Sequence, residues 1–461
     1  MPARLLLSLA ATAVTRGTAT EQPRHSAPPL NAGLRVSADG RHLEDAAGRP
    51  FFWLGDTAWE LLHRADADEA AAYLSDRAAK GFNVILTVVL AEQNGLTAPN
   101  AQGHLPLIDE DPTRPNEAYF LHVDHVIAKA RALGLHVGLL PTWGDKFNRR
   151  WGIGPEVFTP ANARTYGAWL AARYRDAPVI WILGGDRLPD QPVHTEIIDA
   201  MAAGIRSIAG DRQLITYHPW GERSSSEVFH DRPWLDFNLF QSGHARRDGL
   251  NFEMTRRDRA LTPAKPVIDG EPCYEDHPVN WKRGPGDEWF GEFEVRRAAY
   301  WSLLAGAAGH TYGNHNLWQL WQPGRAPISH ARTPWRQALE HPGASQMGIM
   351  RRLFETRPWT RLRPRDDVLG DLPAAPEATV LAAVDADGRF VLVYTPFGHA
   401  FSLARSALAG TPLKAQWIDP RRGAHHEISL SETSEAALAF DPPGEPARGN
   451  DWVLAVESVA P

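Results

Sequence analysis

The chain has 461 residues, enough for two or three domains, and its composition is ordinary for a globular protein. The net charge of -7 gives no reason to expect a nucleic-acid partner. The single cysteine, Cys273, excludes an internal disulfide, and no Cys/His cluster has zinc-like spacing. We therefore predict neither a metal site nor a cofactor.

Residues 1–30 differ in composition from the rest of the chain. A short apolar run over 5–14 follows Arg4, and a Pro-rich stretch over 21–30 comes after it. This order is typical of a secretory signal followed by a disordered connection, and the run is too short to span a membrane. We predict a periplasmic or secreted protein without a membrane span. If the segment is only a disordered extension, the protein is cytoplasmic.

Residues 31–360 alternate between strand-like and helix-like patterns. An alternating stretch over 35–52, with turn signals inside it, predicts a β-hairpin at the start. Apolar runs bounded by Gly or Pro predict eight buried strands, at 51–55, 83–90, 136–142, 179–184, 213–218, 235–240, 266–270 and 309–312. Helical patterns lie between them, at 68–80, 118–133, 160–174, 194–209 and 292–305.

This alternation predicts a protein of the α/β class whose main domain is a (β/α)8 TIM barrel. The alternative is an open, doubly wound sheet. The sequence disfavours it, because no Gly-rich phosphate-binding loop follows the first predicted strand.

Residues 361–461 follow a different pattern, with short strands and turns but no helical periodicity. The strands are predicted at 380–383, 390–394, 415–419 and 452–456, separated by turn signals such as Asp387-Gly388. We predict a small all-β sandwich that acts as an accessory domain.

Polar and aromatic side chains follow every predicted barrel strand. In a (β/α)8 barrel these positions, at the carboxyl ends of the strands, carry the active site. Acidic, amide, imidazole and indole groups in one bowl suit an oligo- or polysaccharide, whose hydroxyls form hydrogen bonds and whose rings stack on aromatic faces. We predict that the substrate contacts come from Asp56, Trp59, Gln93, Trp143, Asp145, Arg187, His218, Gln241, His244, Tyr274, Glu275, Tyr312 and Asn314.

Some of these acidic residues have structural alternatives. Asp56 precedes Thr57 and is also compatible with capping the next helix. Asp145 is equally compatible with a capping role. Asp269 has the same strand parity as Glu271, and we interpret it as a hydrogen-bond partner behind the site.

Two carboxylates occupy facing strand ends in this arrangement. Asp186 follows the fourth predicted strand and Glu271 follows the seventh, so the two side chains face each other across the barrel. Hydrolysis of a glycoside needs one carboxylic acid that protonates the leaving oxygen. It also needs a second carboxylate that attacks the anomeric carbon or activates water. We predict that Asp186 and Glu271 are this catalytic pair.

Several short motifs occur in the order found in one enzyme family. They are Gly55-Asp56-Thr57-Ala58-Trp59, Lys80-Gly81-Phe82-Asn83, Pro141-Thr142-Trp143-Gly144-Asp145, Trp181-Ile182-Leu183-Gly184-Gly185-Asp186-Arg187, Gln241-Ser242-Gly243-His244, Asp269-Gly270-Glu271-Pro272 with Tyr274-Glu275, and Gly309-His310-Thr311-Tyr312-Gly313-Asn314. With these motifs, the region from about 35 to about 360 resembles the apiosidase-like glycoside hydrolases, glycoside hydrolase family 140. The C-terminal domain, with Trp417-Ile418-Asp419-Pro420-Arg421 and Asp451-Trp452-Val453-Leu454, is similar to the collagen-binding-type domain often attached to this family. We infer no collagen binding from that likeness.

The resemblance implies a retaining (β/α)8 enzyme that releases apiose, a branched pentose, from side chains of pectic polysaccharide. The acid/base of the family matches Asp186, and its nucleophile matches Glu271. Two alternatives stay open. One is an exo-glycosidase that acts on a different sugar, and the other is a carbohydrate-binding protein without catalysis.

Overall fold

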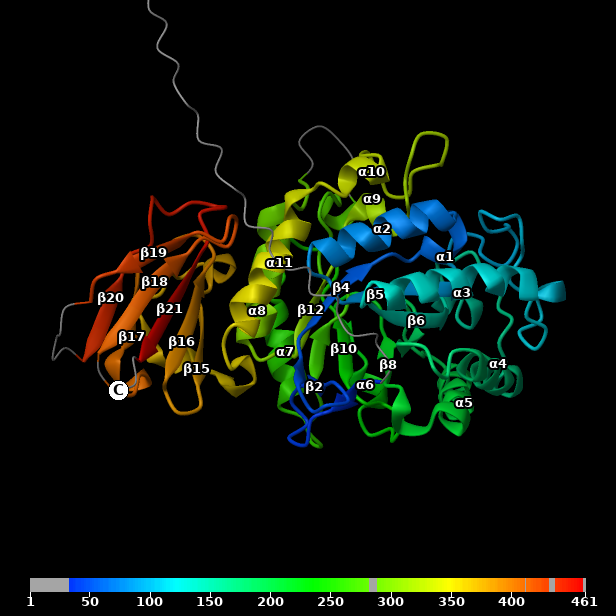
Figure 1. The fold of residues 1–461 in the computed structure, drawn as a ribbon, viewed down its shortest axis with the longest axis horizontal. Helices are drawn as coiled ribbons and strands as arrows, with labels where there is room; N and C mark the ends of the chain where they lie inside the picture. The colour runs from blue at the N-terminus through cyan, green and yellow to red at the C-terminus, as the bar shows by residue number, and fades with distance from the viewer. Residues whose placement is uncertain (1–32, 282–287, 411, 431–435, 459–461) are drawn as a thin grey trace, which may run out of the picture.

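The computed structural model describes residues 33–281, 288–410, 412–430 and 436–458. It consists of a barrel of parallel strands surrounded by helices and, beside the barrel, a β-sandwich (Figure 1). The predicted (β/α)8 barrel with a C-terminal sandwich is confirmed. The segment predicted over 1–30 as a signal or disordered start lies outside the described residues.

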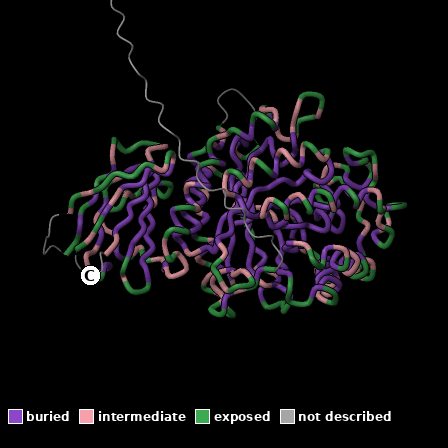
Figure 2. Tube along the Cα trace, in the orientation of Figure 1, coloured by how far each residue is buried: buried purple, intermediate pink, exposed green. Residues whose placement is uncertain are grey.

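Eight parallel strands form the barrel, and every residue in them is buried (Figure 2). Strands buried on both faces need near-continuous apolar runs, which is why these segments could be predicted. The strands are β4 (Trp53–Thr57), β5 (Val84–Leu90), β6 (His136–Thr142), β7 (Val179–Gly184), β8 (Ile215–His218), β10 (Asn238–Gln241), β11 (Val267–Asp269) and β12 (Gly309–Tyr312).

The strand order is β8-β7-β6-β5-β4-β12-β11-β10, and a short strand, β9 (Arg223–Ser224), pairs with β10 in antiparallel sense. The sheet closes between β8 and β10. There the N–H of Asp236 donates to the carbonyl of Ile215 over 2.9 Å, and the Thr216 hydroxyl donates to the carbonyl of Phe237 over 2.7 Å. This closure excludes the open, doubly wound sheet.

The five predicted helices are present as α2, α3, α4, α5 and α8, and further helices lie in the connections. α2 begins at a capping box formed by Asp66 and Glu69, and α4 begins at one formed by Thr159 and Asn162. The helices are α1 (Leu61–Arg64), α2 (Ala67–Ala79), α3 (Glu117–Ala132), α4 (Pro160–Arg173), α5 (Pro192–Ala209), α6 (Ser226–Phe229), α7 (Asn251–Arg259), α8 (Glu292–Leu304), α9 (His315–Trp318), α10 (Trp335–Ala338) and α11 (Pro342–Glu355).

The segment before the barrel is a small antiparallel sheet rather than a simple hairpin. Its strands are β1 (Arg35–Val36), β2 (Leu43–Glu44) and β3 (Pro50–Phe51), in the order β1-β2-β3. The predicted hairpin therefore gains a third short strand directly before β4.

The C-terminal domain has a six-stranded sheet, in the order β13-β15-β16-β21-β18-β19, and a three-stranded sheet, in the order β14-β17-β20. Its strands are β13 (Leu362–Pro364), β14 (Leu369–Gly370), β15 (Leu381–Asp385), β16 (Phe390–Thr395), β17 (Phe401–Ala404), β18 (Leu413–Ile418), β19 (His425–Ile428), β20 (Ala437–Phe440) and β21 (Trp452–Ser458).

The larger sheet of the sandwich is buried on both faces. Along β16, Val391 and Val393 belong to the core within the sandwich, whereas Leu392 and Tyr394 belong to a core shared with the barrel helices α8 and α11. The Tyr394 ring stacks on Tyr300 of α8, with ring centres 4.8 Å apart. Figure 1 shows α8 and α11 between the barrel strands and this sheet. The sandwich is therefore the outer layer of a continuous core.

None of the helices in the described ranges has the length and apolar character that crossing a membrane requires.

Candidate active site

A cavity of about 740 Å³ opens at the carboxyl ends of the barrel strands. Predicted and unpredicted residues line it together: Trp59, Glu92, Gln93, Trp143, Trp151, Asp186, Trp220, Gly221, Glu222, Gln241, Gly243, His244, Ala245, Glu271, Tyr274, His277, Trp281, His315, Trp318, Ile328 and Ser329. Its size and its mixture of aromatic and polar walls suit a small part of a carbohydrate chain.

Asp186 reaches the cavity through an unusual backbone turn after β7. Gly184 and Gly185 have φ of 86° and 121°, and Asp186 itself has φ of 53°. A Cβ at Gly184 would lie 2.6 Å from the Tyr217 ring, so only glycine fits there. A non-glycine residue in the left-handed region is strained, and such strain is often found at functional sites.

Glu271 follows β11 and is held by two imidazoles. His218 Nε2 lies 2.8 Å from Oε2 of Glu271, and His244 Nε2 lies 3.1 Å from Oε1. The Nδ1 atom of His218 accepts the backbone N–H of Asp186 over 3.2 Å, so neutral His218 carries its proton on Nε2, toward Glu271. One ring thus ties the backbone of Asp186 to the carboxylate of Glu271.

The two carboxyl groups are driven to opposite ionisation states. Burial raises the pKa of Asp186 to about 7, and the negative charge of Glu271 adds to this rise. Burial alone would also raise the pKa of Glu271, but the hydrogen bonds from His218 and His244 outweigh it and lower the pKa to about 2. Between these limits Asp186 is a carboxylic acid and Glu271 is an anion.

A third carboxyl group, Glu92, lines the same cavity after β5. Burial raises its pKa to about 7, with the charge of Asp145 as the next cause. Glu92 also contributes to the raised pKa of Asp186. When Glu92 is ionised, its negative charge therefore favours the protonated form of Asp186.

The inner wall combines aromatic faces with free hydrogen-bonding atoms. Trp59 donates from Nε1 to the Tyr274 hydroxyl over 2.8 Å, and its ring centre lies 5.3 Å from that of Trp143. Within the described part of the chain, Nε1 of Trp143, Oε1 of Gln241 and Nδ1 of His244 are buried without a hydrogen-bond partner. Buried polar atoms usually have partners, so these three are placed to receive hydroxyls of a bound sugar.

Residues 37–361 match the family model described as "Apiosidase-like, catalytic domain". The chain belongs to the apiosidase-like family. Residues 364–457 match a second model, described as "Putative collagen-binding domain of a collagenase".

Solved structures place this apiosidase-like chain among glycoside hydrolases. One structure titled "Glycoside hydrolase" is 32% identical with a TM-score of 0.85, over 94% of this chain and 99% of its own. A glycoside hydrolase family 5 structure from Bacteroides vulgatus ATCC 8482 is also 32% identical, with a TM-score of 0.86 over 95% of this chain and 96% of its own. The protein is a glycoside hydrolase. The family number 140 stays a prediction, and the comparison with curated proteins gave no match.

Of the residues predicted for the apiosidase-like site, eight line the cavity: Trp59, Gln93, Trp143, Asp186, Gln241, His244, Glu271 and Tyr274. Two more stand directly behind the carboxylates. His218 contacts Glu271, and Arg187 donates to the carbonyl of Asp186 over 2.7 Å while its Nη1 lies 3.4 Å from the carboxylate. For these two, contact with the carboxylates replaces the predicted contact with substrate.

The prediction that Asp56 contacts substrate is wrong, and so is its capping alternative. Asp56 is fully buried and accepts hydrogen bonds from the Tyr73 hydroxyl (2.7 Å) and from Arg77 (3.3 Å). Both partners are on α2, and the N-cap residue of α1 is Glu60. Asp56 therefore fastens a barrel strand to its covering helix.

Asp145 is also withdrawn as a substrate contact. It is fully buried, pairs with Lys146 at 2.8 Å and accepts the backbone N–H groups of Ile153 (3.1 Å) and Gly154 (2.8 Å). Its carboxylate thus organises the loop after β6. This explains why an acidic residue stands at that strand end.

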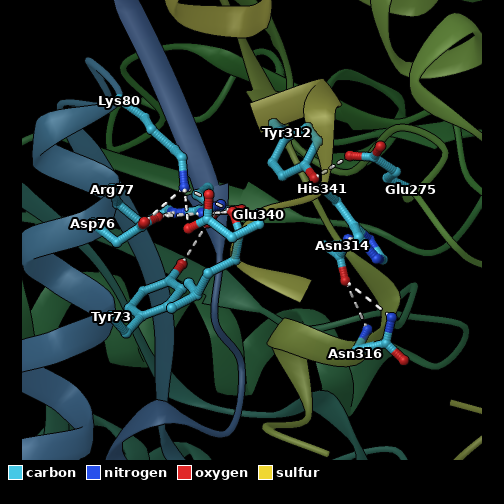
Figure 3. A network of polar contacts seen from close by, with 12 residues as sticks. Tyr73, Asp76, Arg77, Lys80, Glu275, Tyr312, Asn314, Asn316, Glu340 and His341 are labelled. Atoms are coloured by element: carbon cyan, nitrogen blue, oxygen red, sulfur yellow. Dashed lines mark hydrogen bonds and ion pairs between the residues drawn. The ribbon is translucent and has the colours of Figure 1, made fainter. Parts of the chain in front are cut away.

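Glu275, Tyr312 and Asn314 are buried and do not line the cavity, and Figure 3 shows the polar contacts that they make instead. The Tyr312 hydroxyl donates to Glu275 over 2.5 Å, and the N–H of Gly343 donates to the same carboxyl group over 3.2 Å. Asn314 caps α9 and lies 2.8 Å from Nδ1 of His341. These predicted contacts are corrected, since all three side chains are buried and hold the segment before α11.

Figure 3 also shows Asp76, Arg77 and Lys80 gathered beside this segment. Lys80 donates to the carbonyl of Leu339 over 2.7 Å, and Arg77 donates to the same carbonyl over 3.1 Å. This network is a structural joint between α2 and the chain before α11. Asp269 accepts from Ser242 (2.7 Å) and from Asn251 of α7 (3.0 Å), so it is a hydrogen-bond partner outside the cavity, as interpreted, although it shares strand parity with Glu271.

The cavity residues that the sequence did not single out include Trp151, His277, Trp281 and Trp318. They lie in long connections after β6, β11 and β12, not at strand ends. The only signal for the three tryptophans is the high tryptophan count, 17 in the whole chain, and His277 has none. Among the described residues, no group of three or more His, Cys, Asp or Glu side chains is arranged to hold a metal ion.

Proposed function

We propose that the protein is a retaining glycosidase that releases apiose from side chains of pectic polysaccharide, with Asp186 as acid/base and Glu271 as nucleophile. The observation that carries this proposal is the pair of carboxyl groups in one cavity, with two imidazoles 2.8 and 3.1 Å from the carboxylate of Glu271, while burial raises the pKa of Asp186. The protonated Asp186 gives its proton to the leaving oxygen while the Glu271 anion attacks the anomeric carbon. The choice of apiose rests on membership of the apiosidase-like family.

The walls of the cavity support a neutral sugar next to the carboxylates. Trp59, Trp143 and Tyr274 offer ring faces, while Gln241 and His244 offer polar atoms. In the second step, water enters from the face that the leaving group vacated, and Asp186 takes its proton. The configuration at the anomeric carbon is then retained.

The stereochemistry of transfer to methanol tests this function. With an apiose-bearing pectic oligosaccharide and methanol as acceptor, we expect a methyl apioside with the anomeric configuration of the substrate, as measured by proton NMR. Methanol is used because the released sugar itself loses this information by mutarotation. A methyl glycoside of inverted configuration would overturn the mechanism. Turnover only with glycosides of another sugar would support the proposed chemistry but show that apiose is not the sugar released.

The pH dependence of kcat/KM provides a second test. Asp186 must be protonated, so activity should fall as the pH rises through its pKa of about 7, while Glu271 stays ionised down to about 2. Asp186→Asn should flatten the alkaline limb. It should spare glycosides with an activated aryl leaving group, because these depart without a proton, and strongly slow unactivated ones. Equal loss on both substrate types would contradict the acid/base role.

A further inference from the structure

Two tryptophans form an open aromatic edge on one side of the cavity. Trp151 keeps 56% of its surface exposed, and its ring centre lies 5.5 Å from that of Trp220 at an interplanar angle of 42°. The guanidinium of Arg150 covers Trp220, with its Cζ 4.6 Å from the ring centre. Large aromatic side chains exposed in this way are costly to keep in water, which points to a binding surface.

The loop that carries Trp151 is held in place from below. The carboxylate of Asp145 accepts the backbone N–H groups of Ile153 and Gly154, which lie two and three residues after Trp151. A Cβ at Gly152 would lie 2.2 Å from Cβ of Asp145 and 2.6 Å from Nη2 of Arg187. The loop is therefore closely packed on Asp145 and Arg187, so Trp151 has a fixed position although it is exposed.

Arg187 connects this edge to the acid/base. Its Nη1 contacts Asp186, and its Cζ lies 4.2 Å from the ring centre of Trp151. Arg187 is fully buried and also donates to the carbonyl of Asn148 over 3.0 Å, at the base of the same loop. Trp151 thus stands on the Asp186 side of the cavity.

A second exposed tryptophan, Trp281, belongs to the opposite side. It is 48% exposed and packs edge-on against His244 and His277, with ring centres 6.2 and 5.8 Å apart. His244 is one of the two imidazoles bound to Glu271. The cavity therefore has one aromatic edge on the side of the acid, Asp186, and another on the side of the nucleophile, Glu271.

We infer that Trp151 and Trp220 form the subsite for the leaving group, and that this leaving group is itself a sugar ring which stacks its C–H face on the two indoles. This inference rests on the proposed function, because it takes Asp186 as the acid. The acid protonates the oxygen that departs with the leaving group, so groups next to the acid contact that half of the substrate. Trp281, beside the nucleophile's imidazole, contacts the sugar that is transferred.

The test compares two substrates that share the transferred sugar and differ in the leaving group. One is an apiose-bearing pectic oligosaccharide, and the other is the corresponding apiosyl fluoride, whose fluoride cannot stack on any ring. For Trp151→Ala we expect kcat/KM on the oligosaccharide to fall about tenfold, mainly through KM, while the fluoride is hydrolysed at close to the wild-type rate. Trp151→Phe should restore most of the loss.

Trp281→Ala is the matched control, since it also removes an exposed tryptophan from the cavity edge. We expect it to change kcat/KM by the same factor for both substrates. A Trp151→Ala variant that affects both substrates alike, or neither, would overturn the subsite. If the wild-type protein hydrolyses neither substrate, the proposed function is wrong and the subsite falls with it.

Discussion

Glu271→Gln is expected to reduce turnover of every glycoside by roughly 10³-fold or more while leaving the fold intact. The amide keeps the shape of the side chain and removes the charge that attacks the anomeric carbon. It also removes the negative charge that helps to raise the pKa of Asp186. The residual activity should therefore begin to fall at a lower pH than that of the wild type. Steady-state rates over a pH series measure both effects.

Azide can distinguish a missing nucleophile from a damaged site. In Glu271→Ala, azide has room to attack the anomeric carbon from the vacated position as the leaving group departs with a proton from Asp186. The expected product is a glycosyl azide of inverted configuration, identified by NMR.

Glu275→Gln is the matched control for Glu271, four residues away. Its carboxyl group is bound by Tyr312 and Gly343 outside the cavity, so turnover should stay close to wild type. A Glu271→Gln enzyme that keeps roughly a tenth of the wild-type rate, or a Glu275→Gln enzyme that loses most of it, would contradict the assignment.

The barrel could be predicted from the sequence because its strands are buried on both faces. Val84–Leu90 and Val179–Gly184 are continuous apolar runs, and each ends where polar residues begin. The strand ends then indicated Asp186 and Glu271, since carboxyl ends of parallel strands meet on one side of a barrel. What remained open was which polar side chains point into the bowl.

That direction depends on tertiary partners that the sequence does not reveal. Asp56 and Asp145 occupy strand-end positions like those of Asp186, yet Arg77 and Lys146 pair with them inside the protein. Trp151 enters the cavity from a loop that Asp145 organises. Asp56 and Asp145 are thus withdrawn from the cavity, and their effect on the site becomes indirect.

Two strands of the sandwich carry a sequence pattern typical of burial on both faces. In antiparallel sheets with one solvated face, apolar and polar residues alternate. Here Leu381–Asp385 and Trp452–Ser458 begin with four or more buried residues in succession. Such runs predict a sheet covered on both faces, and α8 and α11 provide the second cover. The sandwich follows the catalytic domain in the sequence, but it shares a hydrophobic core with α8 and α11 of that domain.

A buried ion pair joins the two domains at this shared core. Arg296 of α8 donates to both carboxylate oxygens of Asp451, over 2.9 and 2.7 Å, and Asp451 also accepts from the Tyr394 hydroxyl. Asp451→Ala would leave the guanidinium buried without its anion. We expect the free energy of unfolding to fall by about 3–5 kcal/mol, as measured by denaturant titration. Asp387→Ala, which removes a half-exposed partner of Arg361, should cost far less, because exposed ion pairs contribute little to stability.

A chain ending at Arg361 should fail to fold cooperatively. It lacks Asp451 and the face formed by Leu392, Tyr394 and Val453, so the apolar sides of α8 and α11 would meet water. We expect aggregation, or a broad thermal transition by circular dichroism, in place of a monodisperse enzyme. Among the described residues, the cavity lining ends at Ser329, so we expect any loss of activity to come through folding rather than through the site. A soluble truncated chain with a sharp transition and wild-type turnover on a small aryl glycoside would show that the barrel folds without its outer layer.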